Sequence, residues 1–124
     1  MGFARCSGIL MPLSSLPGGY GIGSMGAPAR KFVDFLAAAG QTIWQILPVG
    51  PTGYADSPYQ SCSAFAGNPY FIDLDHLVRD GLLTRRDFAK IHWGGDAAHI
   101  DYGTLYEKRF DVLRKAYANF LKQR

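Results

Sequence analysis

Residues 42–50 read Thr-Ile-Trp-Gln-Ile-Leu-Pro-Val-Gly, a run rich in β-branched and aromatic side chains. This composition is typical of a β-strand, and Pro48 falls at its end, where a missing backbone hydrogen bond costs least. Residues 8–13 read Gly-Ile-Leu-Met-Pro-Leu, a continuous apolar run typical of a strand buried on both faces of a parallel sheet. We therefore expect two strands, at residues 8–13 and 42–50.

The segment between the two expected strands has the pattern of an amphipathic helix. Its apolar side chains recur at the helical period and are Phe32, Val33, Leu36 and Ala37. Pro28 is favourable in a first helical turn and Gly40 lies where a glycine often ends a helix, so we expect a helix from Ala29 to Gly40. A strand, a helix and a strand in this order predict a βαβ unit and an α/β fold with parallel strands.

Composition excludes several classes of protein. The 124 residues are 48% hydrophobic and 14% aromatic, which is too apolar for a disordered segment. Prolines and glycines interrupt every apolar stretch before it reaches the roughly 18 residues that a membrane span needs. All 7 prolines and 11 of the 15 glycines lie within residues 1–75, so the chain has two unlike halves, and the second half favours helices.

Charge and cysteine content narrow the possible partners and location. The net charge is only +3, and basic residues alternate with acids at spacings typical of solvated helix faces, so we do not expect nucleic-acid binding. Cys6 and Cys62 form no disulfide framework and, without a secretory signal, indicate reduced thiols of a cytoplasmic protein. Because His76, His92 and His99 have no neighbours at ligand spacing, we expect no metal site.

Residues 50–71 form a connection that is much longer than usual and rich in aromatic side chains. Its part at residues 54–60, Tyr-Ala-Asp-Ser-Pro-Tyr-Gln, follows a parallel strand, and such strand ends hold the ligand sites of α/β folds. Aromatic faces suit sugar rings, and Asp56, Ser57 and Gln60 offer hydrogen bonds to hydroxyl groups. A sugar site is one interpretation; the other is that the aromatic residues only pack the loop down.

Three helices are expected in the second half. Asp75 is positioned to cap a short helix, and Thr84 with Asp87 fits a capping box for another helix that extends to Ile91. Residues 104–122 carry apolar side chains at helical spacing, with basic residues on the other face. This pattern predicts one long amphipathic helix.

Residues 21–26 could also form a dinucleotide-binding turn, which would be an alternative to a sugar site. They read Gly-Ile-Gly-Ser-Met-Gly, a literal G-x-G-x-x-G between a strand and a helix. In such a turn the first glycine follows the strand directly, and an acid about twenty residues later holds the ribose. Here the strand ends near Leu13 and no acid lies between Asp34 and Asp56. A tightly turned loop is therefore favoured over nucleotide binding.

Catalytic carboxylates are not evident. Glycoside hydrolysis uses two Asp or Glu groups about 5 to 10 Å apart. The single glutamate, Glu107, lies on the polar side of the last helix, and Asp73 and Asp75 are better explained as helix-capping residues. Asp56 alone lies in a site-like loop, so no catalytic pair is credible. The serines and histidines form no Ser-His-Asp set either.

Several motifs, in order, carry a resemblance to a known family. They are Ser7-Gly-Ile-Leu-Met-Pro-Leu-Ser-Ser-Leu-Pro17, Tyr20-Gly-Ile-Gly23, Phe32-Val-Asp-Phe-Leu36, Trp44-Gln-Ile-Leu-Pro-Val-Gly-Pro-Thr-Gly53, Asp56-Ser-Pro-Tyr-Gln60 and Ser63-Ala-Phe-Ala-Gly-Asn-Pro-Tyr70. The matches continue through residues 72–77 and, more loosely, through residues 101–106 and 114–120. Together they resemble the opening of the 4-α-glucanotransferases (amylomaltases or disproportionating enzymes) over nearly the whole chain.

The resemblance implies the amino-terminal part of a (β/α)8 TIM barrel. Residues 1–75 would supply its first two parallel strands, the connecting helix and a long βα loop, and residues 76–124 would begin an inserted helical subdomain. The implied enzyme transfers α-1,4-glucan segments between maltooligosaccharides with retention of configuration and needs no metal or organic cofactor. A full barrel takes about 250 residues, and the family's catalytic acids come from later strands, so we expect no catalytic residue and no activity in this chain alone.

The resemblance also implies substrate-binding residues in the long loop. Tyr59 is expected to flank the sugar in the donor subsite next to the cleaved bond, Ser57 to bond a nearby glucose hydroxyl, and Tyr54 to belong to a secondary glucan-binding site. The implied partners are a maltooligosaccharide or α-1,4-glucan and the remainder of the enzyme chain, not nucleic acid or a membrane. The alternative is a non-catalytic carbohydrate-binding or structural fragment.

Overall fold

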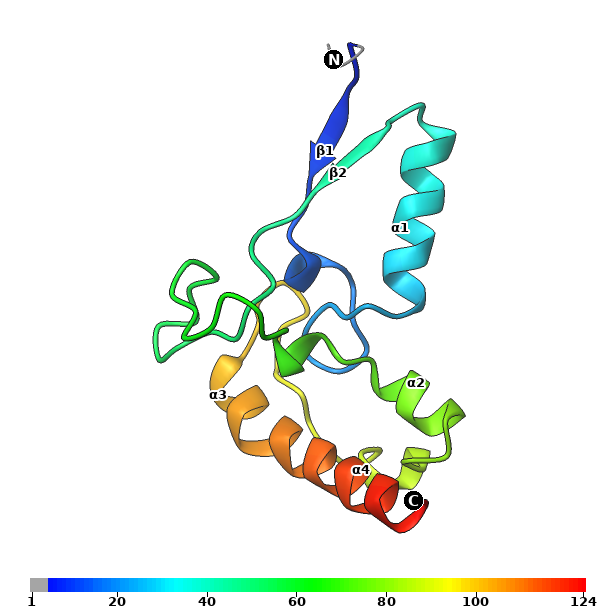
Figure 1. Ribbon diagram of the computed structural model, residues 1–124, viewed down its shortest axis with the longest axis vertical. Coiled ribbons are helices and arrows are strands. Elements are labelled where there is room, and N and C mark those ends of the chain that lie inside the picture. Colours follow the sequence, from blue (N-terminus) through cyan, green and yellow to red (C-terminus); the bar gives the residue numbers. More distant parts are fainter. Residues whose placement is uncertain (1–4) are drawn as a thin grey trace.

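The computed structural model describes residues 5–124 and contains the expected βαβ unit (Figure 1). Strand β1 (Gly8–Leu10) pairs in parallel with β2 (Ile43–Gln45), with Ile9 opposite Trp44. Helix α1 (Ala27–Ala38) connects the two strands. The prediction of parallel strands joined by a helix is therefore confirmed, while residues 1–4 of the expected 1–75 segment lie outside the described residues.

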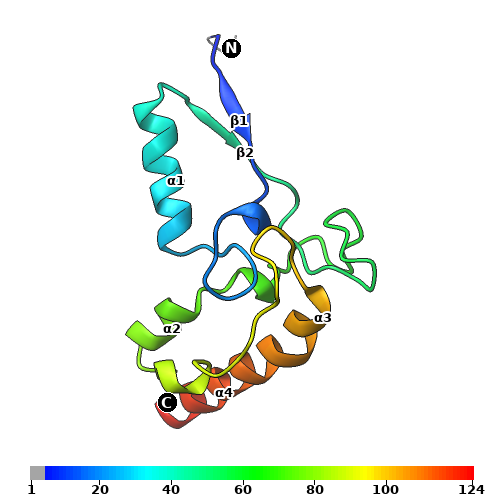
Figure 2. The ribbon, with the colours of Figure 1, turned by 180° about the vertical axis from the view of Figure 1, so that it is seen from behind.

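The two strands are shorter and more exposed than the sequence predicts. Each pairs over 3 residues, because Pro12 and Pro48, which lack a backbone N–H, lie just beyond the paired stretch. Burial on both faces is a wrong prediction for this chain, since Leu10 is 56% exposed and Ile43 is 47% exposed. Within residues 5–124, α1 packs along the pair and no further layer covers it (Figures 1 and 2).

Helix α1 follows the predicted course, although it begins and ends two residues earlier. Pro28 lies in its first turn, and Gly40 adopts a φ of +71° just beyond its end. Phe32 lies edge-on to Trp44, with 5.1 Å between the ring centroids. The cluster around this pair also contains the buried residues Leu13, Leu16 and Ala29. Apolar contacts of this kind hold a short amphipathic helix against its sheet.

Residues 16–26 form an irregular, glycine-rich loop that includes the tightly turned segment favoured for residues 21–26. Close packing requires four of its glycines, Gly18, Gly21, Gly23 and Gly26; a Cβ at Gly23, for example, would overlap the carbonyl oxygen of Leu13, and a Cβ at Gly26 would overlap the carboxylate of Asp73. Gly26 is also the N-cap of α1, so Asp73 brings a carboxylate to the place where dinucleotide phosphates would bind. The loop therefore supports the tight-turn interpretation over nucleotide binding.

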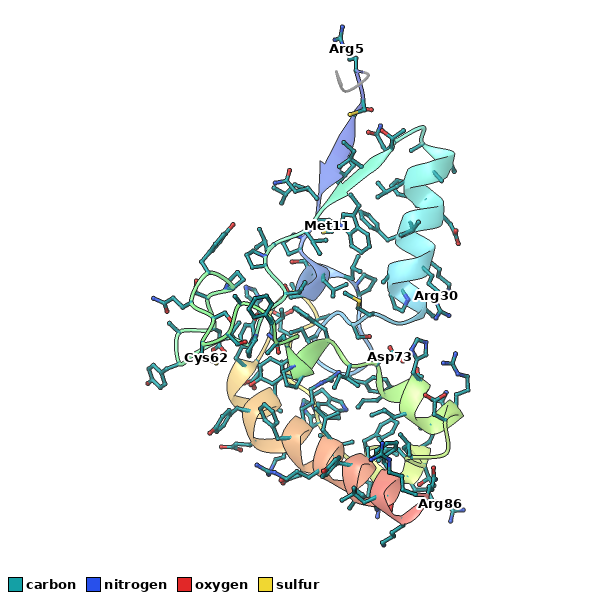
Figure 3. All side chains as sticks on the ribbon, in the orientation of Figure 1. Arg5, Met11, Arg30, Cys62, Asp73 and Arg86 are labelled. Carbon is teal, nitrogen blue, oxygen red and sulfur yellow. The ribbon has the colours of Figure 1, made fainter. Side chains whose placement is uncertain are left out.

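Of the two aspartates expected to cap a helix, Asp73 is the one that caps α2 (Leu74–Arg79). Asp73 Oδ1 accepts a hydrogen bond from the His76 N–H at 3.0 Å, whereas Asp75 lies in the first turn and accepts one from the Tyr20 hydroxyl at 2.8 Å. The assignment of Asp75 as the cap is wrong because the helix already begins at residue 74. In Figure 3, Asp73 lies between α1 and α2.

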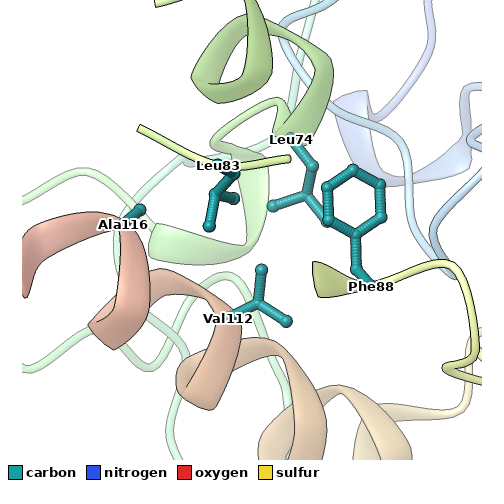
Figure 4. Packing of buried hydrophobic residues seen from close by; sticks show 5 residues of the cluster. All are labelled: Leu74, Leu83, Phe88, Val112 and Ala116. Atoms are coloured by element: carbon teal, nitrogen blue, oxygen red, sulfur yellow. The ribbon is translucent and has the colours of Figure 1, made fainter. Parts of the chain in front are cut away.

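The expected capping box of Thr84 and Asp87 is confirmed, but it caps a single 3-10 turn, η3 (Arg85–Asp87). The turn does not extend to Ile91, because the backbone leaves the helical path at Phe88, whose side chain is buried. Phe88 belongs to the core cluster of the second half, which Figure 4 shows; its other buried members are Leu74, Leu83, Val112 and Ala116.

The last helix is continuous but consists of three parts: α3 (Tyr102–Thr104), the π-helical turn η4 (Leu105–Arg109) and α4 (Phe110–Lys122). It begins two residues before the predicted start, because Asp101 caps it by accepting a hydrogen bond from the Thr104 N–H at 2.9 Å. The π turn is a feature that the sequence analysis did not predict. No helix within residues 5–124 is long and apolar enough to cross a membrane.

Candidate functional site

The chain between β2 and the short turn η2 (Pro69–Phe71) projects from one side of the molecule (Figure 1). Asn68 anchors its end, because its N–H donates to the Val49 carbonyl at 2.8 Å and its side chain accepts from the Tyr70 N–H at 2.9 Å. Farther out, the Ser63 hydroxyl accepts a hydrogen bond from the Ala66 N–H at 3.1 Å. The loop therefore has its own hydrogen-bonded turns.

A pocket of about 520 Å³ lies where this loop meets the start of the last helix. We call it the tyrosine pocket; its lining residues are Thr52, Gly53, Tyr54, Asp56, Tyr70, Tyr102, Gly103 and Tyr106. Two parts of the chain line the pocket, residues 52–56 with Tyr70 and residues 102–106, and we call each of them a wall; the two walls meet where Tyr70 packs against Tyr102. Tyr70 is buried, Tyr54 is fully exposed and Tyr106 is 71% exposed. Concave sites of this size, lined by aromatic side chains and a few polar groups, are typical of small-molecule binding.

Two tyrosines of the pocket, the buried Tyr70 and the half-buried Tyr102, remain hydrogen-bond donors. The ring of Tyr70 lies 6.2 Å from that of Tyr102 and 5.5 Å from that of Phe110, measured between centroids. Burial raises the pKa of both Tyr70 and Tyr102, and the negative charge of Asp56 raises each pKa further. Both hydroxyl groups therefore keep their protons at neutral pH.

Asp56 has an unusual backbone conformation at the edge of the pocket. Its φ of +53° lies in the left-handed region, which aspartate adopts more readily than most residues do. Its N–H donates to the Gly53 carbonyl at 3.0 Å, which closes a turn with Tyr54 and Ala55 at its centre. Backbone strain of this kind concentrates at functional sites, because a tight turn aims particular side chains.

The residues expected to bind substrate are only partly brought together. Tyr54 lines the tyrosine pocket with Asp56, whereas Ser57 and Tyr59 lie on the same loop but are not among the lining residues. The Ser57 hydroxyl accepts a hydrogen bond from the Tyr59 N–H at 3.3 Å, and the Tyr59 side chain is 72% exposed. Tyr59 thus projects outward from a turn that Ser57 stabilises.

Three tyrosines of the pocket were not identified as site residues from the sequence. Tyr106 was assigned to the apolar face of the last helix, and Tyr70 was noted only as one aromatic residue of the long loop. One signal was present, because Tyr102 and Tyr106 are four residues apart and such residues share a helix face. Periodicity does not reveal that this face meets the loop at residues 52–56.

Three other features of residues 5–124 were considered as candidate sites: a second pocket, possible metal ligands and the free cysteines. A second pocket of about 560 Å³ lies between the glycine-rich loop and residues 93–100, but two of its polar side chains, Asp96 and His99, bond to each other at 2.6 Å. Within residues 5–124, no group of three or more Cys, His, Asp or Glu side chains could hold a metal ion. Cys6 and Cys62 are free and exposed, and Figure 3 places Cys62 on the projecting loop.

The parallel strand pair joined by a helix places the chain in the α/β class, and the aromatic pocket is lined in part by the loop that follows β2. A family profile described as 4-alpha-glucanotransferase matches residues 11–124. The chain belongs to the 4-α-glucanotransferase family.

Individual relatives agree with this assignment. The 4-alpha-glucanotransferase of Streptococcus pneumoniae strain TIGR4 is 55% identical over 118 residues, which are 95% of this chain and 23% of that protein. The Thermus thermophilus 4-alpha-glucanotransferase is 48% identical over 97% of this chain and 23% of its own length. Among solved structures, the amylomaltase from Streptococcus agalactiae in complex with acarbose matches with a TM-score of 0.93 and 50% identity, over 96% of this chain and 24% of that one. The chain thus spans about a quarter of the length of these relatives.

Proposed function

We propose that this chain is the first part of a 4-α-glucanotransferase and that it supplies glucan-binding side chains but no catalytic acid. The intact enzyme transfers α-1,4-glucan segments between maltooligosaccharides with retention of configuration. The tyrosine pocket is the observation that carries the proposal. The match to an amylomaltase that was solved with acarbose supports it as well.

The chemistry of the pocket suits an α-glucan. Tyrosine rings present flat apolar faces to the apolar faces of glucose, and their hydroxyl groups bond sugar hydroxyls. In this proposal Tyr54, with Tyr102 and Tyr106 opposite, holds a glucan chain at a secondary site. Tyr59 and Ser57 contact the sugar in the donor subsite next to the cleaved bond, which the remainder of the enzyme chain completes.

The exposed apolar side chains fit the same proposal. Those of the strand pair and α1 include Ile9, Leu10, Ile43, Val33 and Phe35, and all are exposed in this chain. In a (β/α)8 barrel, neighbouring strands and helices would cover them. Residues 1–75 would then be the first part of the barrel and residues 76–124 the start of an inserted helical subdomain, in a cytoplasmic enzyme that needs no cofactor.

Binding of maltoheptaose to the chain tests the proposal, with isothermal titration calorimetry as the measurement. We expect saturable binding that Tyr54→Ala weakens about tenfold, because an aromatic contact of this kind is worth on the order of 1 kcal/mol. The matched control is Tyr117→Ala, since Tyr117 is also an exposed tyrosine but lies on α4 outside the pocket. Equal affinity of the wild type and Tyr54→Ala would refute the role of the pocket.

A non-catalytic glucan-binding protein is the second candidate function. The acids near the junction of the two halves favour it, because each already has a structural partner. Asp73 accepts hydrogen bonds from the Ser24 hydroxyl at 2.6 Å and from the His76 N–H, and Asp75 bonds Tyr20. The two candidates predict the same binding and differ in whether the chain becomes active when the rest of the enzyme is supplied.

A further inference from the structure

Arg109 is fully buried, which is rare for an arginine. Its Nη1 donates to the Tyr20 carbonyl at 3.1 Å, and its Nη2 donates to the Ile72 carbonyl at 2.7 Å. The guanidinium also lies 5.9 Å from the centre of the Trp93 ring, in a cation–π arrangement. One side chain therefore joins the glycine-rich loop, the segment after η2 and the residues before α3.

Both walls of the tyrosine pocket connect directly to this arginine. Ile72 follows Tyr70 by two residues, so the hydrogen bond to the Ile72 carbonyl holds the segment that carries the Tyr70 wall. Arg109 itself belongs to η4, the π turn that also carries Tyr106 of the opposite wall. Turns of this kind are frequent at functional sites. Arg109 thus bonds the segment that follows one wall and belongs to the turn that carries part of the other, and it is not among the lining residues.

The charge of Arg109 is costly where it lies. Burial lowers the pKa of Arg109 to about 10, and the negative charge of Asp73 opposes that shift, so the group stays charged at neutral pH. Its hydrogen bonds go to neutral carbonyl groups, and its Nε, which is buried, has no hydrogen-bond partner among the described residues. Taking a charge out of water is costly, so the burial of Arg109 is by itself weak evidence that the side chain stabilises the fold. An apolar side chain, however, could not donate hydrogen bonds to the Tyr20 and Ile72 carbonyls, which lie on two separate segments.

We propose that Arg109 is a positioning residue for glucan binding: it sets the distance between the Tyr70 and Tyr106 walls, and the affinity of the pocket depends on it. This inference rests on the proposed function of the tyrosine pocket. In this inference Arg109, which is buried and does not line the pocket, holds the two tyrosine walls where both can contact one glucan chain.

Substitutions of equal size test the inference in the 124-residue chain. Arg109→Met keeps the length of the side chain and removes all donors, and Arg109→Lys keeps the charge but concentrates its donors on one atom. We expect maltoheptaose affinity to fall about tenfold in Arg109→Met, with an intermediate value in Arg109→Lys. The control is Arg114→Met on the same helix, because Arg114 is exposed and bonds only Asp111, one turn away. Wild-type affinity in a folded Arg109→Met would overturn the proposal.

A second measurement needs no ligand and separates positioning from general stability. In chains labelled with 3-fluorotyrosine, ¹⁹F resonances report the surroundings of each ring. We expect Arg109→Met to shift the resonances of Tyr70, Tyr102 and Tyr106 and to leave that of Tyr117, on α4, unchanged. Unshifted pocket resonances, or equal shifts at Tyr117, would overturn the proposal.

The two measurements also separate this inference from the proposed function. If the wild type does not bind maltoheptaose but the pocket resonances shift in Arg109→Met, the proposed function fails and the positioning of the walls by Arg109 is supported. If the wild type and Arg109→Met bind equally and the resonances do not shift, the proposed function stands and the role of Arg109 fails.

Discussion

Gly26 lies where the N-terminus of α1 meets the carboxylate of Asp73. A Cβ at this position would overlap that carboxylate, which also accepts a hydrogen bond from the Ser24 hydroxyl at 2.6 Å and caps α2 through the His76 N–H. Three local requirements, a helix start, a buried carboxylate and a second helix cap, thus converge on a residue without a side chain.

Gly26→Ala is therefore expected to destabilise the chain by about 1 to 3 kcal/mol, the usual cost of forcing extra atoms into a packed region. The measurement is the free energy of unfolding in urea. Gly19→Ala is the matched control, because a Cβ at Gly19 would meet nothing within 4 Å. Equal stability of Gly26→Ala and the wild type would show that the Asp73 carboxylate moves without cost.

Some residues of the candidate site could be identified from the sequence, and others could not. Tyr54 was identified through a resemblance between short motifs, and the structure places it in the pocket. Tyr102 and Tyr106 were not, because their contact with the loop depends on how two distant segments pack. Arg109 appears in the sequence as one more basic residue of a helix, and its burial depends on tertiary contacts with Tyr20 and Ile72.

At the scale of elements, the spacing of apolar residues correctly predicted the longer helices and the order of strands and helix. The βαβ order, helix α1 and the long last helix are all present, because their apolar patterns are long enough to distinguish a helix from a strand. The π turn η4 was not predicted, since apolar spacing does not separate it from an α-helix. The helix expected up to Ile91 is a single turn, because burial of Phe88 overrides local helix signals.

The contact between η3 and α4 is expected to depend on pH. Hydrogen bonds from Lys115 and from the Thr84 N–H lower the pKa of Asp87 to about 2. A carboxylate whose pKa is lower in the folded chain stabilises it above the unfolded pKa of about 3.9, and this contribution is lost as the pH falls through the folded value. The contact should therefore weaken between about pH 4 and about pH 2.

Urea unfolding between pH 6 and pH 2 measures this effect. Asp87→Asn should remove this part of the pH dependence. Asp80→Asn should retain it, because Asp80 is exposed and bonds only the neighbouring Arg79. If Asp87→Asn keeps the wild-type pH dependence, the ion pair with Lys115 does not contribute.

At the scale of the whole molecule, residues 5–124 form a packed region at each end and a third buried cluster between them, which contains Ile22, Tyr70 and Leu105. The strand pair and α1 lie at one end, and the core of α2, η3 and α4 lies at the other (Figures 1 and 4). The glycine-rich loop and residues 69–72 lie between them. The tyrosine pocket lies at this junction, so glucan binding in our proposal depends on how the two regions are held together.

The most direct test of the central claim, that this chain binds glucan but does not catalyse transfer, is an assay on maltotriose. Glucose and longer maltooligosaccharides would be measured for the 124-residue chain and for a chimera in which it replaces the matching quarter of the Streptococcus agalactiae amylomaltase. We predict no product from the chain alone, transfer by the chimera, and markedly slower turnover in the chimera with Tyr59→Ala. Product from the chain alone, or a folded chimera without activity, would contradict the account.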